Sequence, residues 1–442
     1  MMIRTRFAPS PTGSLHIGSL RSALYPYALA KHDNGDFVLR IEDTDKKREV
    51  PGSKEKIGEI LKLFGINWDE YYVQSERLEI YKKAAEKLVK DGHAFYCECK
   101  PKNAKEEGFS KVLRDPCRDK KLTVGAIKLK VPDNEKLIYH DFVLDKNISW
   151  TSNDVIDATL LKTDGFPTYH LAAMTDDLEM KITHVLRGHD WMPSTPIHIL
   201  VYKYLGGKMP ELGHLTDILD PAGGKLSKRK GSTSVEGLMS EGFLPEAILN
   251  FIMLLGWAPK DNQELFTLEE FVKIFDPSGL QKSNPVFNHE KLEWFNGEYI
   301  RKLSDKKLVE KISNFYKNKY EIELLTKITP LIKDRIKKLS DFESFASFFF
   351  EKPKVDIKLF ENNYKEHLKI AIEVFEKMNK WTAEELEIFS RDAIAAKNFP
   401  TGKFFMSLRI AITGSKFTPP INESIIILGK DETINRLKAV LT

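Results

Sequence analysis

Residues 6–18 read RFAPSPTGSLHIG, and this stretch decides the fold. Alternating polar and apolar residues from Ile3 to Ala8 predict a strand before it. Pro9 and Pro11 end that strand, because each proline fixes its own φ and moves the preceding residue out of the helical region. A helix is expected from about Gly18 to Lys31. The stretch is therefore the end of a strand, a stiff polar loop and the start of a helix.

The start of that helix is suited to a triphosphate. Unpaired amides and the positive end of the helix dipole attract anions there. Gly13 permits a positive φ or a close approach by the ligand, and His16 can donate to phosphate oxygens. The ordinary alternative is that Gly13 and Gly18 are turn glycines and His16 is a surface residue. The whole Pro-Ser-Pro-Thr-Gly context favours the phosphate site.

A second basic stretch lies about two hundred residues later and reads Lys225-Leu226-Ser227-Lys228-Arg229. Two lysines that flank a serine can reach the phosphates during phosphoryl or adenylyl transfer. Most short charge runs are solvated loops, so this signal is weak alone. Together with the helix start, Lys225 and Lys228 indicate an enzyme that activates a substrate with a nucleotide.

Charged residues at other strand ends indicate a second pocket beside the phosphates. The stretch 40–45 reads RIEDTD and ends a predicted strand, where parallel α/β sheets bind their ligands. Glu42 could hold an ammonium group there. Arg6, Arg187 and Tyr169 stand near other strand ends, and two arginines that face one pocket would select an anionic side chain. The alternative is that these arginines form ordinary salt bridges to nearby aspartates.

The three cysteines of the chain lie close together in the sequence. Cys97, Cys99 and Cys117, with Asp119, could bind zinc, since three thiolates and a carboxylate can form a tetrahedral site. The alternative is three reduced thiols without a metal, and the sequence leaves both readings open. An odd and small number of cysteines argues against a disulfide scaffold and favours the reducing cytoplasm.

Length and charge set the broad class. The chain has 442 residues, of which 42% are apolar, so it is too long for one ordinary domain. Its net charge of +4 neither requires nor excludes a nucleic-acid partner. No apolar run approaches the roughly 18 residues of a membrane span, and the N-terminus lacks a signal peptide. We expect a cytoplasmic protein without a membrane partner.

Strands and helices alternate in the first hundred residues, which predicts a doubly wound α/β domain. Residues 95–150 interrupt the alternation and are expected to be an insertion on the edge of that domain. The pattern resumes near Asp157 and becomes helical from about Leu244. Beyond Arg301 we expect an all-helical domain.

Taken in order, these motifs resemble the class I glutamyl-tRNA synthetases of bacterial and organellar type. The motifs that carry the resemblance are RFAPSPTG (6–13), HIG (16–18), RIEDTD (40–45), DGFPTYH (164–170), THVLRG (183–188), KLSKR (225–229) and EGFLPEA (241–247). It continues through residues 287–300 and 408–414 and so covers nearly the full chain.

The resemblance implies an architecture of five parts. It is an α/β Rossmann-type catalytic domain with an inserted α+β acceptor-binding region, followed by an all-α anticodon-binding region. The implied boundaries are 1–94 and 157–220 for the two catalytic halves, 95–156 for the insertion that meets the tRNA acceptor end, 221–303 for a helical stem-contact region with the lysine loop, and 304–442 for the anticodon-binding domain.

The resemblance also implies the reaction. ATP, accompanied by Mg²⁺, activates L-glutamate, which is then transferred to the 3′ end of tRNA(Glu); some relatives also charge tRNA(Gln). The glutamate residues implied are Arg6, Ser10, Glu42, Tyr169 and Arg187. The ATP residues implied are Ser10, Thr12, Gly13, His16, Gly18 and Lys228, and the catalytic set is His16, Gly18, Lys225 and Lys228. We expect a monomer, as is usual among similar enzymes.

Two departures and two alternatives accompany the resemblance. Ala173 stands where some members carry an asparagine that contacts the amino acid, and Asp119 stands where zinc-binding members often have histidine. One alternative is a glutamyl transferase that acts on a modified tRNA base, a class that resembles only the catalytic half; the helical region after Arg301 argues against it. The other is a tRNA-binding regulatory module with an inactive site, which the presence of His16 and Lys228 argues against.

Overall fold

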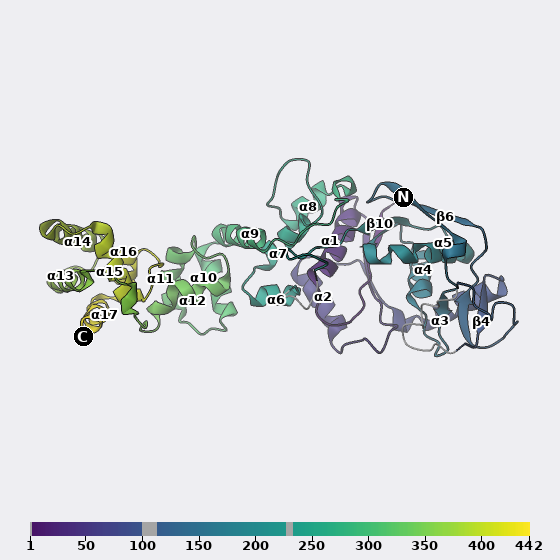
Figure 1. Ribbon diagram of the computed structural model, residues 1–442, viewed down its shortest axis with the longest axis horizontal. Helices are drawn as coiled ribbons and strands as arrows, with labels where there is room; N and C mark the ends of the chain where they lie inside the picture. Colours follow the sequence, from purple (N-terminus) through teal and green to yellow (C-terminus); the bar gives the residue numbers. More distant parts are fainter. Residues whose placement is uncertain (1, 100–112, 227–232) are drawn as a thin grey trace. The chain divides into compact units, whose positions relative to one another are not determined.

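The computed structural model describes residues 2–99, 113–226 and 233–442. The chain divides into two compact units. Unit 1 comprises Met1–Gly237 and Ile248–Asn288, and unit 2 comprises Leu238–Ala247 and His289–Thr442. Figure 1 follows the chain from its purple N-terminus to its yellow C-terminus. Ser227, Lys228 and Arg229 of the predicted lysine loop lie outside the described residues.

Unit 1 contains every strand of the described chain, arranged in three sheets. The strands are β1 (Arg4–Phe7), β2 (Asp36–Ile41), β3 (Glu70–Val73), β4 (Ala94–Cys97), β5 (Ala126–Leu129), β6 (Lys136–Asp141), β7 (Lys146–Thr151), β8 (Thr159–Leu161), β9 (His184–Gly188) and β10 (Glu211–Leu215). Strands β1, β2 and β3 form a parallel sheet, and β9, β10 and β6 form another to which β7 adds an antiparallel edge.

The two parallel sheets meet between β1 and β9. The backbone N–H of Arg4 donates to Thr183 Oγ1 at 2.8 Å, and the backbone N–H of Thr183 donates to the Arg4 carbonyl at 2.8 Å. The amino ends of β1 and β9 are thereby held side by side. The predicted α/β catalytic fold, followed by a helical region, is confirmed.

The helices that begin in unit 1 connect its strands or follow the last strand, β10. They are α1 (Ile17–His32), α2 (Ser53–Leu63), α3 (Leu78–Lys90), α4 (Tyr169–Glu179), α5 (Thr195–Leu205), α6 (Val235–Ser240) and α8 (Leu268–Ile274). Pro26 lies inside α1. Thr267 caps α8 in a capping box with Glu270.

The residues of the predicted insertion contribute strands to two sheets. Strands β4, β5 and β8 form a small antiparallel sheet. Strand β6, by contrast, pairs in parallel with β10 through Asp141 and Leu212, so part of the insertion belongs to the main sheet. Tyr139 and Asp141 are buried as a result.

Unit 2 is helical throughout its described residues. Its helices, with the connecting α7, are α7 (Pro245–Met253), α9 (His289–Lys302), α10 (Asp305–Phe315), α11 (Ile322–Ile332), α12 (Phe342–Ala346), α13 (Tyr364–Lys377), α14 (Ala383–Lys397), α15 (Thr401–Thr413), α16 (Ile421–Leu428) and α17 (Lys430–Leu441). Leu368, Leu386, Leu408, Ile425 and Leu437 bring α13–α17 together in one core. No helix of the described chain is long and apolar enough to span a bilayer.

Candidate active site

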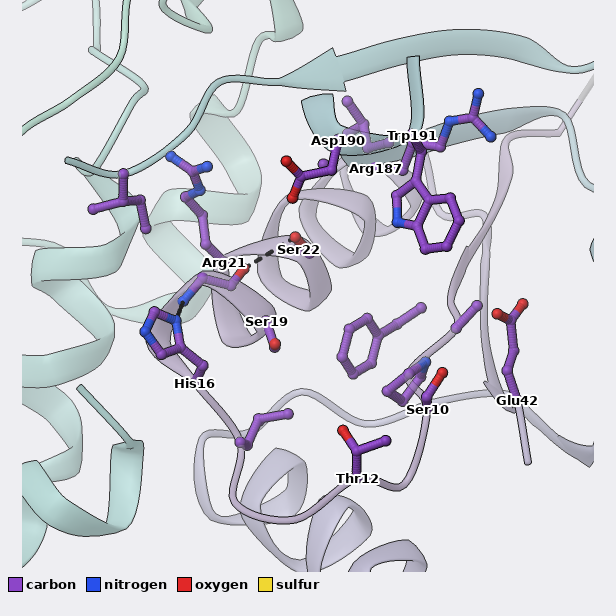
Figure 2. A pocket seen from close by; sticks show the side chains of 18 of the residues that line it. Ser10, Thr12, His16, Ser19, Arg21, Ser22, Glu42, Arg187, Asp190 and Trp191 are labelled. Carbon is purple, nitrogen blue, oxygen red and sulfur yellow. Dashed lines mark hydrogen bonds between the residues drawn. The ribbon is translucent and has the colours of Figure 1, made fainter. Parts of the chain in front are cut away.

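A cavity of about 570 Å³ opens at the carboxyl ends of β1, β2, β9 and β10. This is the edge at which parallel α/β sheets bind ligands. All predicted glutamate, ATP and catalytic residues that the structure describes line it, namely Arg6, Ser10, Thr12, Gly13, His16, Gly18, Glu42, Tyr169, Arg187 and Lys225. Figure 2 shows His16 at one side of this cavity and Glu42 at the other.

The His16 side is built on the start of α1. His16 is the N-cap residue, and its Nδ1 accepts a hydrogen bond from the Gly18 N–H at 3.0 Å (Figure 2). Nδ1 therefore carries no proton in the neutral ring, and the proton is on Nε2. A Cβ on Gly18 would lie 3.2 Å from Nδ1, which favours glycine at this position. Gly13 has a φ of +111°, a conformation that also favours glycine.

Two backbone pairings hold the flanks of the lysine loop at this cavity. On one flank, Leu226 donates to the Ile218 carbonyl at 2.8 Å. On the other, Ile17 donates to the Thr233 carbonyl at 3.1 Å and Val235 donates to the Leu15 carbonyl at 3.0 Å. The start of α1 and the two flanks of the loop therefore lie at the same cavity, although about two hundred residues separate them in the sequence.

Glu42 lies in a buried network of opposite charges. Arg40 is fully buried and donates to Glu42 Oε1 at 3.2 Å and to Asp177 Oδ1 at 2.7 Å. Burial raises the pKa of Glu42 to about 7, against the opposing effect of Arg40 and Arg6. A pKa near this value places the change of charge of the Glu42 carboxyl group close to neutral pH.

The two predicted pocket arginines have different partners. Arg6 Nε lies 3.3 Å from Asp177 Oδ1, so the salt-bridge alternative applies to this residue in part. Arg187 contacts no carboxylate among the described residues. It donates instead to the hydroxyl of Tyr169 at 3.3 Å and of Thr195 at 2.8 Å, and to two histidines. Its positive charge is available to an anionic ligand.

Lys225 lies at the cavity in an ion pair with two aspartates. Its Nζ contacts Asp190 and lies 3.0 Å from Asp217 Oδ1. Asp190 and Trp191 line the cavity but were not predicted. They belong to a 3-10 helix, His189–Ser194, directly after β9. Their position immediately after the strand that carries Arg187 was the signal that could have identified them.

The cysteines form a cluster with a different carboxylate from the one expected. The ligand atoms of Cys97, Cys99, Cys117 and Asp115 lie within 4.8 Å of one another. Asp115 Oδ1 accepts the backbone N–H of Cys117 at 2.8 Å, which turns the Asp115 carboxylate toward the thiols. The Asp119 side chain is 93% exposed and lies 3.8 Å from Lys130. The carboxylate that lies beside the three thiols is therefore that of Asp115 and not, as expected, that of Asp119.

Comparison with known families covers both units. Residues 2–294 match the family described as tRNA synthetases class I (E and Q), catalytic domain. Residues 307–441 match the anticodon binding domain family. The chain belongs to the class I tRNA synthetases of this E and Q family.

Curated relatives of this class I synthetase are similar over their full length. A glutamate–tRNA ligase of Clostridium botulinum is 39% identical over 472 residues, which cover 99% of this chain and 97% of the relative. A glutamate–tRNA ligase of Dehalococcoides mccartyi is 37% identical over 470 residues, which cover 98% and 97%.

A solved structure extends the similarity to the fold. A glutamate tRNA ligase from Elizabethkingia meningosepticum, crystallised in complex with its amino acid, matches with a TM-score of 0.87 and 33% identity and covers 100% of this chain and 99% of that one. The match to an anticodon binding domain disfavours the alternative of an enzyme that resembles only the catalytic half of the family.

Proposed function

We propose that the cavity activates L-glutamate with ATP and transfers it to the 3′ end of tRNA(Glu). The observation that carries this assignment is the single cavity in which Glu42, whose side chain is 11% exposed, and the arginines Arg6 and Arg187 accompany the His16 helix start. Glu42 would hold the α-ammonium of glutamate, and the arginines would hold its side-chain carboxylate. The amino acid and the ATP phosphates would thus meet in one cavity.

The chemistry requires positioning rather than a protein nucleophile. The α-carboxylate of glutamate attacks the α-phosphorus of ATP, the bond to the β-phosphate breaks, and pyrophosphate leaves with its electron pair. A terminal ribose hydroxyl of tRNA then attacks the glutamyl carbonyl, and AMP leaves. His16 Nε2–H and the amides at the start of α1 would stabilise the charge on the phosphates, with Ser10, Thr12, Gly13 and Gly18 around them.

Lysines and a divalent cation complete the proposal. Lys225 and Lys228 would contact the phosphates, and the anchored flanks of the loop support this role for Lys228. Mg²⁺ bound to ATP would neutralise part of the phosphate charge. In this assignment Lys225 exchanges its present pairs with Asp190 and Asp217 for phosphate oxygens.

Pyrophosphate exchange tests the assignment. With tRNA(Glu) present, exchange should require L-glutamate, and His16→Ala should lower its rate on the order of a hundredfold. Lys228→Ala should depress exchange severely, whereas Lys260→Ala, which removes an exposed lysine, should leave it unchanged. Undiminished exchange in the Lys228 variant would refute its role. Full tRNA affinity without any ATP turnover would support the regulatory module instead.

We propose a zinc ion at Cys97, Cys99, Cys117 and Asp115, because three thiols and a carboxylate match the tetrahedral donor set of zinc. Lys128 lies 2.6 Å from Asp115 at present and would share that carboxylate with the metal. Metal analysis of the purified protein should find one zinc per chain, lowered by Cys99→Ser and by Asp115→Asn but not by Asp119→Asn. A protein without zinc would favour three reduced thiols.

We propose that different regions of the chain contact different parts of the tRNA. Residues 95–156 would meet the acceptor end, residues 221–303 the stem, and residues 304–442 the anticodon. Charging assays with purified tRNA(Glu) and tRNA(Gln) decide whether both are substrates. We further propose that the enzyme acts in the cytoplasm. We also propose that it is a monomer, and sedimentation of the purified chain would test its oligomeric state.

A further inference from the structure

The guanidinium of Arg187 is held between two buried imidazoles. Its Nε lies 2.9 Å from Nε2 of His214, and its Nη1 lies 3.0 Å from Nδ1 of His198. Both histidines are fully buried. They come from different elements, because His214 is on β10, in register with Arg187 on β9, and His198 is on α5.

The chemistry of arginine determines which ring nitrogens carry protons. A guanidinium has five N–H donors and no acceptor. The ring nitrogens that face Arg187 must therefore be unprotonated acceptors, Nε2 in His214 and Nδ1 in His198. Each histidine must be neutral, and the two must be opposite tautomers.

The second nitrogen of each ring has a partner that suits this assignment. His214 Nδ1 lies 2.6 Å from Asp141 Oδ2 and would donate to it. The Tyr139 hydroxyl also donates to Asp141, at 3.0 Å. His198 Nε2 lies 3.2 Å from His170 Nδ1, to which it would donate. Two chains of hydrogen bonds thus run outward from Arg187, one to Asp141 and one to His170.

Electrostatics favours the neutral state of both rings. Burial lowers the pKa of His214, as do Arg187 and His189, while Asp141 opposes the shift. Burial also lowers the pKa of His198 well below its ordinary value, and the positive charges of Arg187 and Arg6 add to this effect. Protonation of either ring would place a cation against Arg187 and remove an acceptor.

We propose that His198 and His214 are positioning residues that act as neutral acceptors to orient Arg187 toward the side-chain carboxylate of the substrate. The proposal rests on the assignment of Arg187 to glutamate under Proposed function. The Nε and Nη1 contacts fix the rotation of the guanidinium, and Thr195 holds Nη2 at 2.8 Å. The second N–H of Nη2 has no partner in the described chain. Its direction is set by the bonds that Nε, Nη1 and Nη2 make to His214, His198 and Thr195.

Paired substitutions test the two tautomers. Glutamine places its amide oxygen near the position of Nε2, and asparagine places it near that of Nδ1. His214→Leu and His214→Asn should raise the KM for L-glutamate about tenfold or more, because a hydrogen bond to a charged group is lost. His214→Gln should stay within about threefold of wild type. At position 198 the order reverses: His198→Asn should be tolerated, and His198→Gln and His198→Leu should not.

The comparison with ATP separates orientation from general damage. The KM for ATP should change less than about twofold in every folded variant, because Arg187 would contact only the amino acid. The preference for L-glutamate over L-glutamine should fall in the impaired variants. Equal effects of the leucine, asparagine and glutamine variants, or a parallel rise in the KM for ATP, would overturn the proposal.

Arg187→Leu distinguishes the failure of this inference from the failure of the proposed function. If that variant keeps the KM for L-glutamate, the role assigned to Arg187 is wrong. If it raises this KM while the histidine variants do not, only the positioning role fails.

Nitrogen NMR of the histidine-labelled wild-type protein gives a test that needs no variant. Near neutral pH, His214 should show an unprotonated Nε2 and His198 an unprotonated Nδ1. The opposite tautomers, or two protonated nitrogens in either ring, would contradict the proposal.

Discussion

Glu42 is the residue of the cavity whose charge depends most directly on its surroundings. Its pKa is raised to about 7 by burial, with Arg40 and Arg6 opposing. The group that binds an ammonium is the ionised carboxylate, so the useful form is lost as pH falls through this value. A raised acid pKa thus leaves binding strongest on the alkaline side.

The pH dependence of kcat/KM for L-glutamate tests this property. Between about pH 8 and about pH 6 the ionised fraction of Glu42 falls about tenfold, and kcat/KM, which reports the free enzyme, should fall with it. Glu42→Gln should lower kcat/KM and remove this step from the profile. A wild-type profile that is flat across this range would contradict the assignment of Glu42 to the ammonium.

Residue identities were predictable wherever the chemistry is local. The motifs around Arg6, His16 and Glu42 contain the reactive groups in short runs, and the structure places them on one cavity. The position of Asp115 was not predictable in this way. It lies beside the thiols in place of Asp119 because its hydrogen bond to the Cys117 backbone N–H turns its carboxylate toward them, a geometry that ligand spacing alone does not reveal.

At the scale of elements, the turn between α1 and β2 leaves no room for a side chain at Gly35. Gly35 follows Asn34, whose φ is +52°, and its N–H donates to the Ala30 carbonyl at 2.8 Å. A Cβ at Gly35 would lie 2.0 Å from the Ile3 carbonyl oxygen. The turn therefore requires glycine for a steric reason, and it sets the register between β1 and β2.

Gly35→Ala should destabilise unit 1 by about 3 kcal/mol, because the backbone must move to admit the methyl group. Calorimetry would measure the fall in its unfolding temperature. The matched control is Gly402→Ala in α15, where an added Cβ meets nothing within 4 Å. That substitution should be neutral or stabilise by up to about 1 kcal/mol. Equal effects at the two positions would refute the steric argument.

The periodicity of the sequence predicted where helices begin and end better than it predicted which strands pair with one another. The helix expected from about Gly18 to Lys31 is present as α1, Ile17–His32, with each end within one residue of the expected one. The pairing of β6 with β10 was not expected, since the intervening chain contains no periodic signal for it. That pairing brings Asp141 and Tyr139 to His214.

For the whole molecule, the division into two units predicts two thermal transitions. If L-glutamate and ATP bind in the unit 1 cavity as proposed, they should stabilise only that unit. Its free energy of unfolding should rise by about 2.7 kcal/mol at a ligand concentration a hundred times Kd. Leu408 lies on α15 in the core of unit 2. Leu408→Ala should therefore lower only the free energy of unfolding of unit 2, by about 3 kcal/mol. A single transition that both changes shift would contradict independent unfolding.

The sequence by itself determined the chemical groups of the cavity and the class of each element, because motifs and periodicity are local properties of the chain. The tertiary structure alone decided that Asp115 joins the thiols, that α9 belongs to unit 2, and that two neutral histidines hold Arg187. These features depend on contacts between segments far apart in the chain. Such contacts form when strands pair and helices pack, and no local spacing specifies them.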